Sequence, residues 1–419
     1  VECAVMCRAA HRSDIDRVGI PENCLDVLSQ AVIGMSLDMR WDVDDAYELV
    51  KGSYCYRDLP KASFINVLRY LGSKDEHEGV YSKIWYDEEE NQFGRKKGSR
   101  MIYLMNLGTI PEEANYRVIT SHGSTAGELS EKFVERLSPR DVFVLGGRSY
   151  EFVRSKGMMA YVKEANGRKP TVPSWAGEML PRSFDLSMDV ANFRTEMTHE
   201  IDEDPSILVP KICKDFDVDE GSARSIVSYM REQKAVTGFI PDADTLAIEE
   251  YIDPSGNQRI IFHFPFGRRV NDALSRAYAY RLSNIIGKNV SVTITDDNFM
   301  IGTSRKIDLN EIPGMLSSRD LEPVLKKAIK DSEIFKLRFR HTAARSFMIL
   351  RNYMGRPISV NRQQVRSAYL LDTLGDMENE PVIEETYREV LEDDMDIKNA
   401  KYVVEMIESG KMGVKVLPF

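Results

Sequence analysis

The chain has 419 residues, of which 42% are hydrophobic and 29% are charged, and its formal net charge is −10. A chain of this length is expected to hold about two to four domains, because a single core stops growing near roughly 250–300 residues. The negative net charge excludes a molecule that is drawn as a whole to nucleic acid, so any such binding must come from local basic patches.

Residues 20–125 have the pattern of a winged helix, in which three short helices precede a β-hairpin. Apolar residues at helical spacing predict helices over 24–35 and 61–71, the latter ending at Gly72, and Asp42 is the expected N-cap of a helix between them. Strands are predicted over 80–86 and 101–107. The loop between them ends in Arg95, Lys96, Lys97 and Arg100. This basic end touches phosphates in one interpretation and is an ordinary solvated loop in the other.

Asp75-Glu76-His77-Glu78 looks like the metal-binding box of a helicase motor. Such a box must end a buried strand beside a phosphate-binding loop, so that its aspartate reaches Mg²⁺. Here it follows the end of a helix, and no G-x-x-x-x-G-K-[ST] occurs in the chain. We therefore predict a polar loop at this position.

The stretch 137–194 predicts a small basic β-sheet. Alternating runs at 141–145 and 148–153 flank Gly146-Gly147, a strong hairpin signal, and a third strand follows over 158–163. Residues 140–182 contain eight basic and four acidic residues. Trp175 stands on a Pro-rich loop before a helix that starts near 183. Cations and a flat ring are what a single-stranded nucleic acid requires, with Arg148, Arg154 and Lys169 as phosphate contacts. The alternative is solvated charges and a tryptophan packed in the core.

Residues 201–305 predict a second winged-helix-like unit. An acidic linker at 198–205 precedes a helix over 221–234, a hairpin of 246–253 and 258–264, and a helix over 271–282. Arg268 and Arg269, just before the last helix, either reach phosphates or are solvated. His263 is interpreted as a packed histidine, because no second ligand stands at metal spacing.

The C-terminal region carries two blocks of opposite charge. Residues 336–366 hold eight basic and no acidic residues, and residues 372–396 hold eleven acidic residues and one basic residue. In one interpretation the blocks pair with each other inside the fold. In the other, a basic helix lines the exit path of a nucleic-acid strand, with an affinity that falls steeply with salt.

Several longer runs carry a family resemblance, among them IPENCLDVLSQAVIGMSL (20–37), KPTVPSWAGEMLPRSFDL (169–186) and FHFPFGRRVNDALSRAYAYRL (262–282). Essentially the whole chain resembles the large helicase-related (Lhr) family of superfamily 2 ATP-dependent helicases, archaeal type. The resemblance implies an α+β fold and a fragment that follows two RecA-like motor domains. The implied segments are the tail of the second motor domain (1–19), a winged helix (20–125), a β-barrel-like module of the Lhr-specific domain (126–200), a winged-helix-like unit (201–305) and a helical unit (306–419).

The same resemblance implies a function in ATP-driven 3′-to-5′ translocation on single-stranded DNA, in unwinding of duplexes and RNA:DNA hybrids, and in DNA repair. Ile110, in GTIP, matches an aliphatic residue that contacts the loaded strand, and Trp175, in PSWAGE, matches a tryptophan that stacks on a base. For Ile110, packing in the core is the alternative. ATP and Mg²⁺ belong to the motor domains, so we expect no catalytic residue, cofactor or metal in this chain.

Two other classes of function stay open. One is a DNA glycosylase-like base-excision module, although such enzymes use paired polar residues such as Gln-x-Gln, and here Gln363 and Gln364 are adjacent. The other is a non-catalytic protein-interaction scaffold. With no long apolar run, no signal peptide and five scattered cysteines, we expect no membrane partner, no disulfide framework and a cytoplasmic location.

Overall fold

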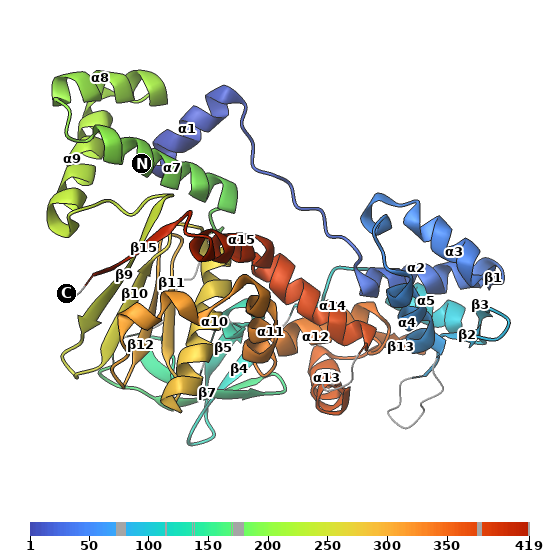
Figure 1. The fold of residues 1–419 in the computed structure, drawn as a ribbon. Helices are drawn as coiled ribbons and strands as arrows, with labels where there is room; N and C mark the ends of the chain where they lie inside the picture. Colours follow the sequence, from blue (N-terminus) through green and yellow to red (C-terminus); the bar gives the residue numbers. More distant parts are fainter. Residues whose placement is uncertain are drawn as a thin grey trace. The chain divides into compact units, whose positions relative to one another are not determined.

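The computed structural model describes residues 1–72, 81–113, 115–135, 137, 139–168, 170, 180–374 and 379–417 (Figure 1). The chain divides into two compact units, and each is assembled from segments that are distant in sequence. Unit 1 comprises residues 1–19, 180–328 and 394–419, and unit 2 comprises residues 20–179 and 329–393. Both contain helices and sheets, so the α+β class is confirmed. The five predicted segments are consecutive stretches of sequence, whereas these two units are defined by contacts in space. The division into five segments therefore stays a prediction.

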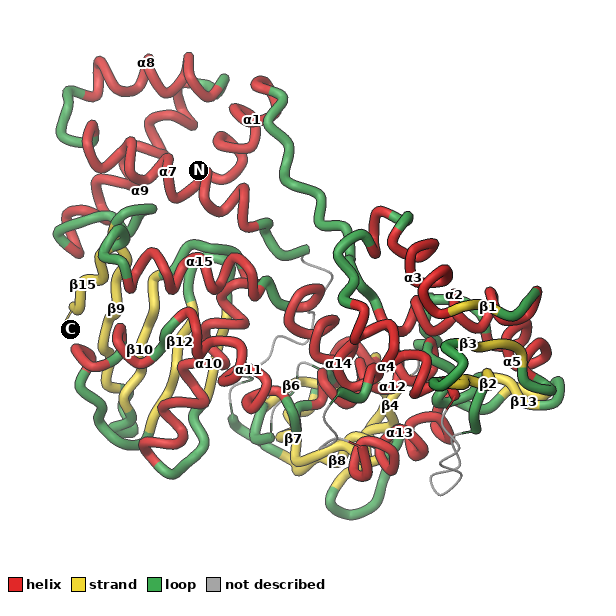
Figure 2. The backbone as a smooth tube through the Cα atoms, turned by 45° about the vertical axis from the view of Figure 1, so that its right-hand side comes forward, coloured by secondary structure: helices red, strands yellow, loops and turns green. Residues whose placement is uncertain are grey.

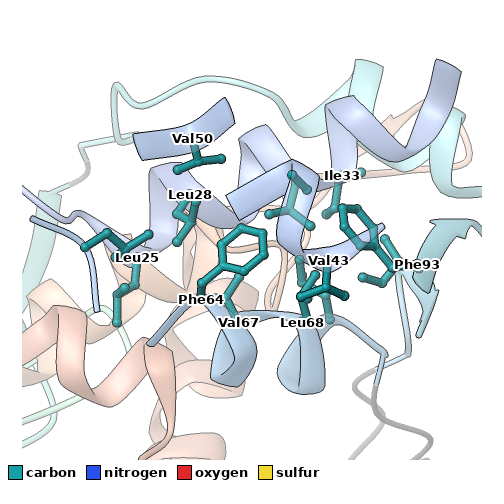
Figure 3. Packing of buried hydrophobic residues seen from close by; sticks show 14 of the residues in the cluster. Leu25, Leu28, Ile33, Val43, Val50, Phe64, Val67, Leu68 and Phe93 are labelled. Carbon is teal, nitrogen blue, oxygen red and sulfur yellow. The ribbon is translucent and has the colours of Figure 1, made fainter. Parts of the chain in front are cut away.

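Unit 2 begins with the winged helix. Its helices are α2 (Leu25–Asp38), α3 (Val43–Lys51), the short η1 (Tyr54–Tyr56) and α4 (Lys61–Gly72). Asp42 caps α3, as predicted, because its side chain accepts hydrogen bonds from the main-chain N–H groups of Asp44 and Asp45. Leu28, Phe64 and Phe93 are fully buried in the core that Figure 3 shows. This core fixes the three helices against the strands of the wing.

The wing is shorter than the sequence pattern indicates. Its strands are β2 (Ile84–Asp87) and β3 (Gln92–Arg95), and β1 (Trp41–Asp42) completes the sheet in the order β1-β3-β2. The prediction of a strand over 101–107 was wrong, because α5 (Ser99–Asn106) occupies that segment. The chain already reverses after Asp87, whose carboxylate accepts hydrogen bonds from two following N–H groups, and Asn91 adopts a φ of 55°. The apolar run that follows is therefore free to form a helix.

The β-module of unit 2 contains β4 (Asn115–Thr120), β5 (Thr125–Ser130), the short α6 (Glu131–Val134), β6 (Val142–Leu145), β7 (Arg148–Lys156) and β8 (Met159–Glu164). The strand order is β5-β4-β8-β7-β6, with β4 and β8 parallel. The three strands predicted around Gly146-Gly147 are confirmed, and both glycines have the positive φ of a tight hairpin turn. Among the described residues the sheet is open, so a barrel-like closure stays a prediction.

The rest of unit 2 is largely helical. It contains α12 (Glu333–Arg345), a hairpin of β13 (Asn352–Tyr353) and β14 (Arg356–Pro357), α13 (Val360–Leu374), α14 (Pro381–Arg388) and a π-helical turn, η5 (Glu389–Asp394). Helix α12 contacts α13, α14 and α2. Helix α14 also contacts α2 and α4, so α12 and α14 pack against the winged helix although they are far from it in sequence.

Unit 1 combines a helical cluster with a second sheet. The cluster contains α1 (Glu2–Arg12), α7 (Phe184–Glu200), α8 (Pro205–Phe216) and α9 (Glu220–Thr237) around Phe193, Phe216 and Met230. The sheet contains β9 (Thr245–Ile252), β10 (Gln258–His263), β11 (Ser291–Ile294), β12 (Phe299–Thr303) and β15 (Gly413–Leu417). The remaining elements are α10 (Arg268–Ile286), η3 (Leu309–Glu311), η4 (Pro313–Met315), α11 (Ser318–Ile329) and α15 (Ile397–Glu408).

The hairpin β9–β10 is not a two-stranded wing, although the sequence pattern suggested one. It forms the middle of a five-stranded sheet with the order β11-β12-β10-β9-β15. The C-terminal strand β15 runs parallel to β9, with Gly413 opposite Thr245, so residues 306–419 are not purely helical. No helix in the described part of the chain is both long and apolar enough to cross a membrane.

Candidate nucleic-acid interface

Ile110 stands on the loop that follows α5 in unit 2. Its side chain is 84% exposed, so the alternative that it packs in the core is wrong. An aliphatic side chain held in solvent gains nothing from folding and is available to a ligand. The loop before it has no regular secondary structure, and its position therefore depends on side chains that reach its main chain.

Arg351 helps to hold this loop. Its guanidinium group donates hydrogen bonds to the carbonyl oxygens of Ile110 at 3.2 Å and Gly108 at 3.1 Å, and also to that of Asn106. Buried Gln30 of α2 contacts Gly108 from within the unit, accepting from its N–H at 3.2 Å and donating to its carbonyl at 3.3 Å. The loop is thus held through hydrogen bonds to its main-chain atoms, and none of these bonds involves the side chain of Ile110.

Asn106, the last residue of α5, links the loop to the β13–β14 hairpin. Its side-chain oxygen accepts hydrogen bonds from the N–H groups of Arg351 and Asn352, each at 2.8 Å. Its amide nitrogen donates to the main-chain carbonyl of Asn352 at 3.1 Å. The side-chain amide of Asn352 donates in turn to the main-chain carbonyl of Met105 at 2.9 Å. Asn106 is 1% exposed, so its side chain is held inside the unit, where it links the two segments.

A buried ion pair lies beneath the loop. Arg340 donates from Nη2 to both carboxylate oxygens of Glu131 at 2.7 Å, and both side chains are almost fully buried. The same nitrogen lies 2.9 Å from Nε2 of His341. Burial, and then the positive charge of Arg340, lowers the pKa of His341 to about 2, so the ring is neutral and accepts this bond. Arg340, Glu131 and His341 together form a buried polar network below the surface of unit 2.

The basic and acidic blocks pair with each other in part. Arg345 binds the carboxylates of Asp26 and Glu389, and Arg338 lies 3.7 Å from a carboxylate oxygen of Glu389. The interpretation of pairing inside the fold is confirmed for these arginines. Other partners stand outside the acidic block: Asp26 for Arg345, Glu135 for Arg338 and Glu131 for Arg340.

Asp26, Glu385 and Glu389 offer carboxylate oxygens within 4.8 Å of one another. Arg345 already binds two of these carboxylates, and Arg388 binds Glu385 at 2.8 Å. Burial raises the pKa of Glu385 to about 8. Guanidinium groups thus neutralise the cluster, and we assign it a structural role.

The β-module presents two of the predicted arginines to solvent. Arg148 begins β7 beside the Gly146-Gly147 turn and is exposed. Arg154 is also exposed, and its guanidinium carbon lies 4.8 Å from the ring centre of Tyr161. Lys169 and Trp175, together with the Asp75–Glu78 box, lie outside the described residues. Unit 2 therefore displays Ile110, Arg148 and Arg154 at its surface.

Arg268 and Arg269 have a different setting, in unit 1 at the start of α10. Both are half-buried. Nη2 of Arg268 lies 3.5 Å from the carbonyl oxygen of Ile294, and Nη2 of Arg269 lies 3.4 Å from that of Met395. Both guanidinium groups thus face carbonyl oxygens of their own unit, and a contact with phosphates stays a prediction. His263 is half-buried and pairs with Glu249 at 2.8 Å, so the prediction of a packed histidine is confirmed.

Sequence reasoning missed the residues that build the interface from below. Gln30, Asn106 and Arg351 act on the main chain of segments remote in sequence, and no local pattern marks such contacts. The β13–β14 hairpin did leave a signal in the sequence, which is Gly355. In the structure Met354 and Gly355 have positive φ values of 48° and 75°, as a two-residue hairpin turn requires.

Two protein-family models match the chain. Residues 8–172 match the winged helix domain of the large helicase-related protein, and residues 240–418 match the DEAD/H associated domain. The fold is similar to that in the "Structure of Mycobacterium smegmatis helicase Lhr bound to ssDNA and AMP-PNP", with a TM-score of 0.74 and 23% identity over 99% of this chain and 49% of that one. The winged helix and the second sheet thus define a helicase-associated region.

Among curated proteins, the "ATP-dependent helicase Lhr-Core protein 2" of Thermococcus barophilus is 43% identical over 99% of this chain and 48% of its own length. The "Lhr helicase/uracil glycosylase" of Escherichia coli is 26% identical over 99% of this chain and 27% of its own length. The chain belongs to the large helicase-related (Lhr) family. It spans about half the length of its archaeal relatives.

Proposed function

We propose that this chain is the nucleic-acid-binding portion of an ATP-dependent 3′-to-5′ DNA helicase or translocase with a role in DNA repair. Its task is to grip the tracking single strand, of DNA or of an RNA:DNA hybrid, while motor domains of the same protein handle ATP and Mg²⁺. The sequence of this chain has no phosphate-binding loop, so no step of ATP hydrolysis is assigned to its residues.

The observation that carries the proposal is the exposure of Ile110 on a loop held by buried polar side chains. Such rigidity keeps an aliphatic group in solvent, where it meets a strand without paying further ordering entropy. The single-stranded DNA bound to the related Mycobacterium smegmatis helicase supports the same ligand class. Arg148 and Arg154 add cations for phosphates, and Trp175 is proposed to stack on a base.

Titration of a fluorescein-labelled single-stranded oligonucleotide with the chain tests this proposal. Because bound arginines release counterions, the affinity should fall with salt, with a slope of about −0.7 per neutralised phosphate on a log–log plot. Ile110→Ala should weaken binding, whereas Ile252→Ala, at an exposed isoleucine on the β-sheet of unit 1, should leave it unchanged. Absence of salt-dependent binding would instead support a protein-interaction scaffold.

A DNA glycosylase-like function is the second candidate, because the name of the Escherichia coli relative includes uracil glycosylase. The paired glutamines do not form an open site here. Gln363 is 2% exposed and donates to the carbonyl of Ile358 at 2.8 Å and to Glu112 at 3.2 Å. Incubation of the chain with uracil-containing single-stranded DNA decides between the candidates. Release of uracil would favour the glycosylase, and intact DNA would retire it.

A further inference from the structure

The hairpin of β13 and β14 presents an aromatic and a thioether side chain to solvent. Tyr353 pairs with Arg356 across the hairpin, and Met354 and Gly355 form its tip. Tyr353 is 52% exposed and Met354 is 74% exposed. A two-stranded hairpin is marginal by itself, and this one carries exposed apolar side chains at its tip, which are accessible to a ligand.

The hairpin and the Ile110 loop are joined by a shared set of hydrogen bonds. Figure 2 shows β13 next to α5, and the two elements are in contact. Asn106 binds the main chain of Asn352 on both its N–H and its carbonyl, and Arg351, one residue earlier, reaches the carbonyl of Ile110. Tyr353 is therefore carried by the same hydrogen-bond network that holds Ile110, and any strand that lies along Ile110 passes close to the hairpin.

Three exposed cations of unit 2 stand on the hairpin itself and on two other elements. Arg356 is exposed on β14, Arg362 is exposed on the first turn of α13, and Lys156 is exposed at the end of β7. The β7–β8 turn touches α13, because a Cβ atom at Gly157 would lie 3.2 Å from Oδ1 of Asn361. None of these three cations forms an ion pair with another described residue. Their charge is left for a ligand with negative charge.

We propose that Tyr353 stacks on a base of the single strand that Ile110 contacts, and that Arg356 and Arg362 neutralise phosphates beside that base. This inference rests on the proposed function and extends its interface to a hairpin that the family resemblance did not supply. A protein surface would also cover exposed tyrosine and methionine. Arg356, directly opposite Tyr353 and paired with no described carboxylate, favours instead a polyanion that carries flat rings.

The test measures affinity for a labelled single-stranded oligonucleotide in the full chain. Stacking of a base on an aromatic ring contributes about 1–3 kcal/mol, so Tyr353→Ala should raise the Kd roughly 5-fold or more. Tyr353→Phe keeps the ring and should stay within about twofold of the wild type. Tyr229→Ala is the matched control, because Tyr229 is equally exposed, at 52%, on α9 of unit 1.

Arg356→Ala and Arg362→Ala should each make the log–log salt slope shallower by about 0.7. Photocrosslinking of a 5-iododeoxyuridine oligonucleotide to the wild-type chain, with the adduct mapped by mass spectrometry, tests the contact without any substitution. An adduct at Tyr353 is the expected result. Wild-type binding that Ile110→Ala weakens but Tyr353→Ala does not, with no adduct on the hairpin, would overturn this inference alone. Absence of wild-type binding would overturn the proposed function.

Discussion

Arg351 donates a hydrogen bond from Nη1 to the carbonyl oxygen of Ile110 at 3.2 Å, across 241 positions of sequence. The same guanidinium group binds the carbonyls of Gly108 and Asn106. One side chain from the connection between α12 and β13 thus determines where the candidate strand-contacting residue stands. Arg351 is a positioning residue in this account, since its charge is used on the protein's own main chain.

Arg351→Ala should therefore loosen the loop and weaken strand binding together. Hydrogen bonds from charged groups contribute about 1.5–3 kcal/mol, and a similar loss in the free energy of unfolding is expected from urea denaturation. Hydrogen exchange at residues 107–110 should speed up. Arg351→Lys, which keeps the charge but not the planar fork, should also weaken binding. If the lysine variant binds like the wild type, the charge itself and not the positioning is what matters.

Asn106→Ala should destabilise unit 2 more than its size suggests. The substitution leaves two partly buried N–H groups, of Arg351 and Asn352, without their acceptor. Each such group costs about 1–3 kcal/mol, so we expect a loss of roughly 2–4 kcal/mol in the free energy of unfolding. Asn115→Ala, at an exposed asparagine that begins β4, is the control and should change stability little. Equal unfolding midpoints for the two variants would contradict the linking role of Asn106.

Removal of one partner of the buried Arg340–Glu131 pair should cost about 3–5 kcal/mol, because the other charge stays buried without compensation. Arg340→Met and Glu131→Leu test the two sides. The double variant should be more stable than the sum of the single losses indicates, since an apolar pair replaces the ion pair. A double-mutant cycle from denaturant titrations measures the coupling, and strict additivity would show that the two groups do not interact.

His341 predicts a loss of stability in acid. Burial lowers its pKa to about 2 in the folded chain, below the ordinary value near 6.5. Its contribution is fully present above pH 6.5 and is lost as the pH falls from there, with a slope of up to about 1.4 kcal/mol per pH unit. Urea denaturation between pH 7.5 and 5 should show a shallower decline for His341→Gln than for the wild type.

His122→Gln, at an exposed histidine in the β4–β5 turn, should leave the acid decline unchanged. Glu385 acts in the opposite direction, because its pKa is raised to about 8 by burial, and its contribution declines as the pH rises from about 4.5 to 8. The comparison of variants, and not the slope of the wild type alone, therefore isolates His341. Parallel curves for His341→Gln and the wild type would contradict the buried neutral ring.

Local patterns were enough to predict much of the secondary structure. The Gly146-Gly147 hairpin and the Asp42 cap follow from residue types whose preferences are strong over short distances. The segment 101–107 was misjudged because short apolar runs fit a strand and a helix equally well. There the position of the preceding turn decided the outcome, and that turn depends on the side chain of Asp87.

Long-range pairing was out of reach. The parallel contact of β15 with β9 joins the last segment of unit 1 to the interior of its long middle segment, and the alternation of the two units along the chain has no local signature. The exposure of Ile110 could not be predicted either, since an isoleucine is usually buried. Its position results from Gln30 and Arg351, two polar residues that look like ordinary surface residues in the sequence.

We propose that this chain grips a single strand through aromatic and aliphatic contacts. The most direct measurement is the Kd of a labelled single-stranded oligonucleotide for the wild type, Trp175→Ala and Trp175→Phe at several salt concentrations. The account predicts that Trp175→Ala raises the Kd about tenfold or more at every salt concentration, and that Trp175→Phe retains most of the affinity. Equal Kd values for the wild type and Trp175→Ala across the salt series would contradict it.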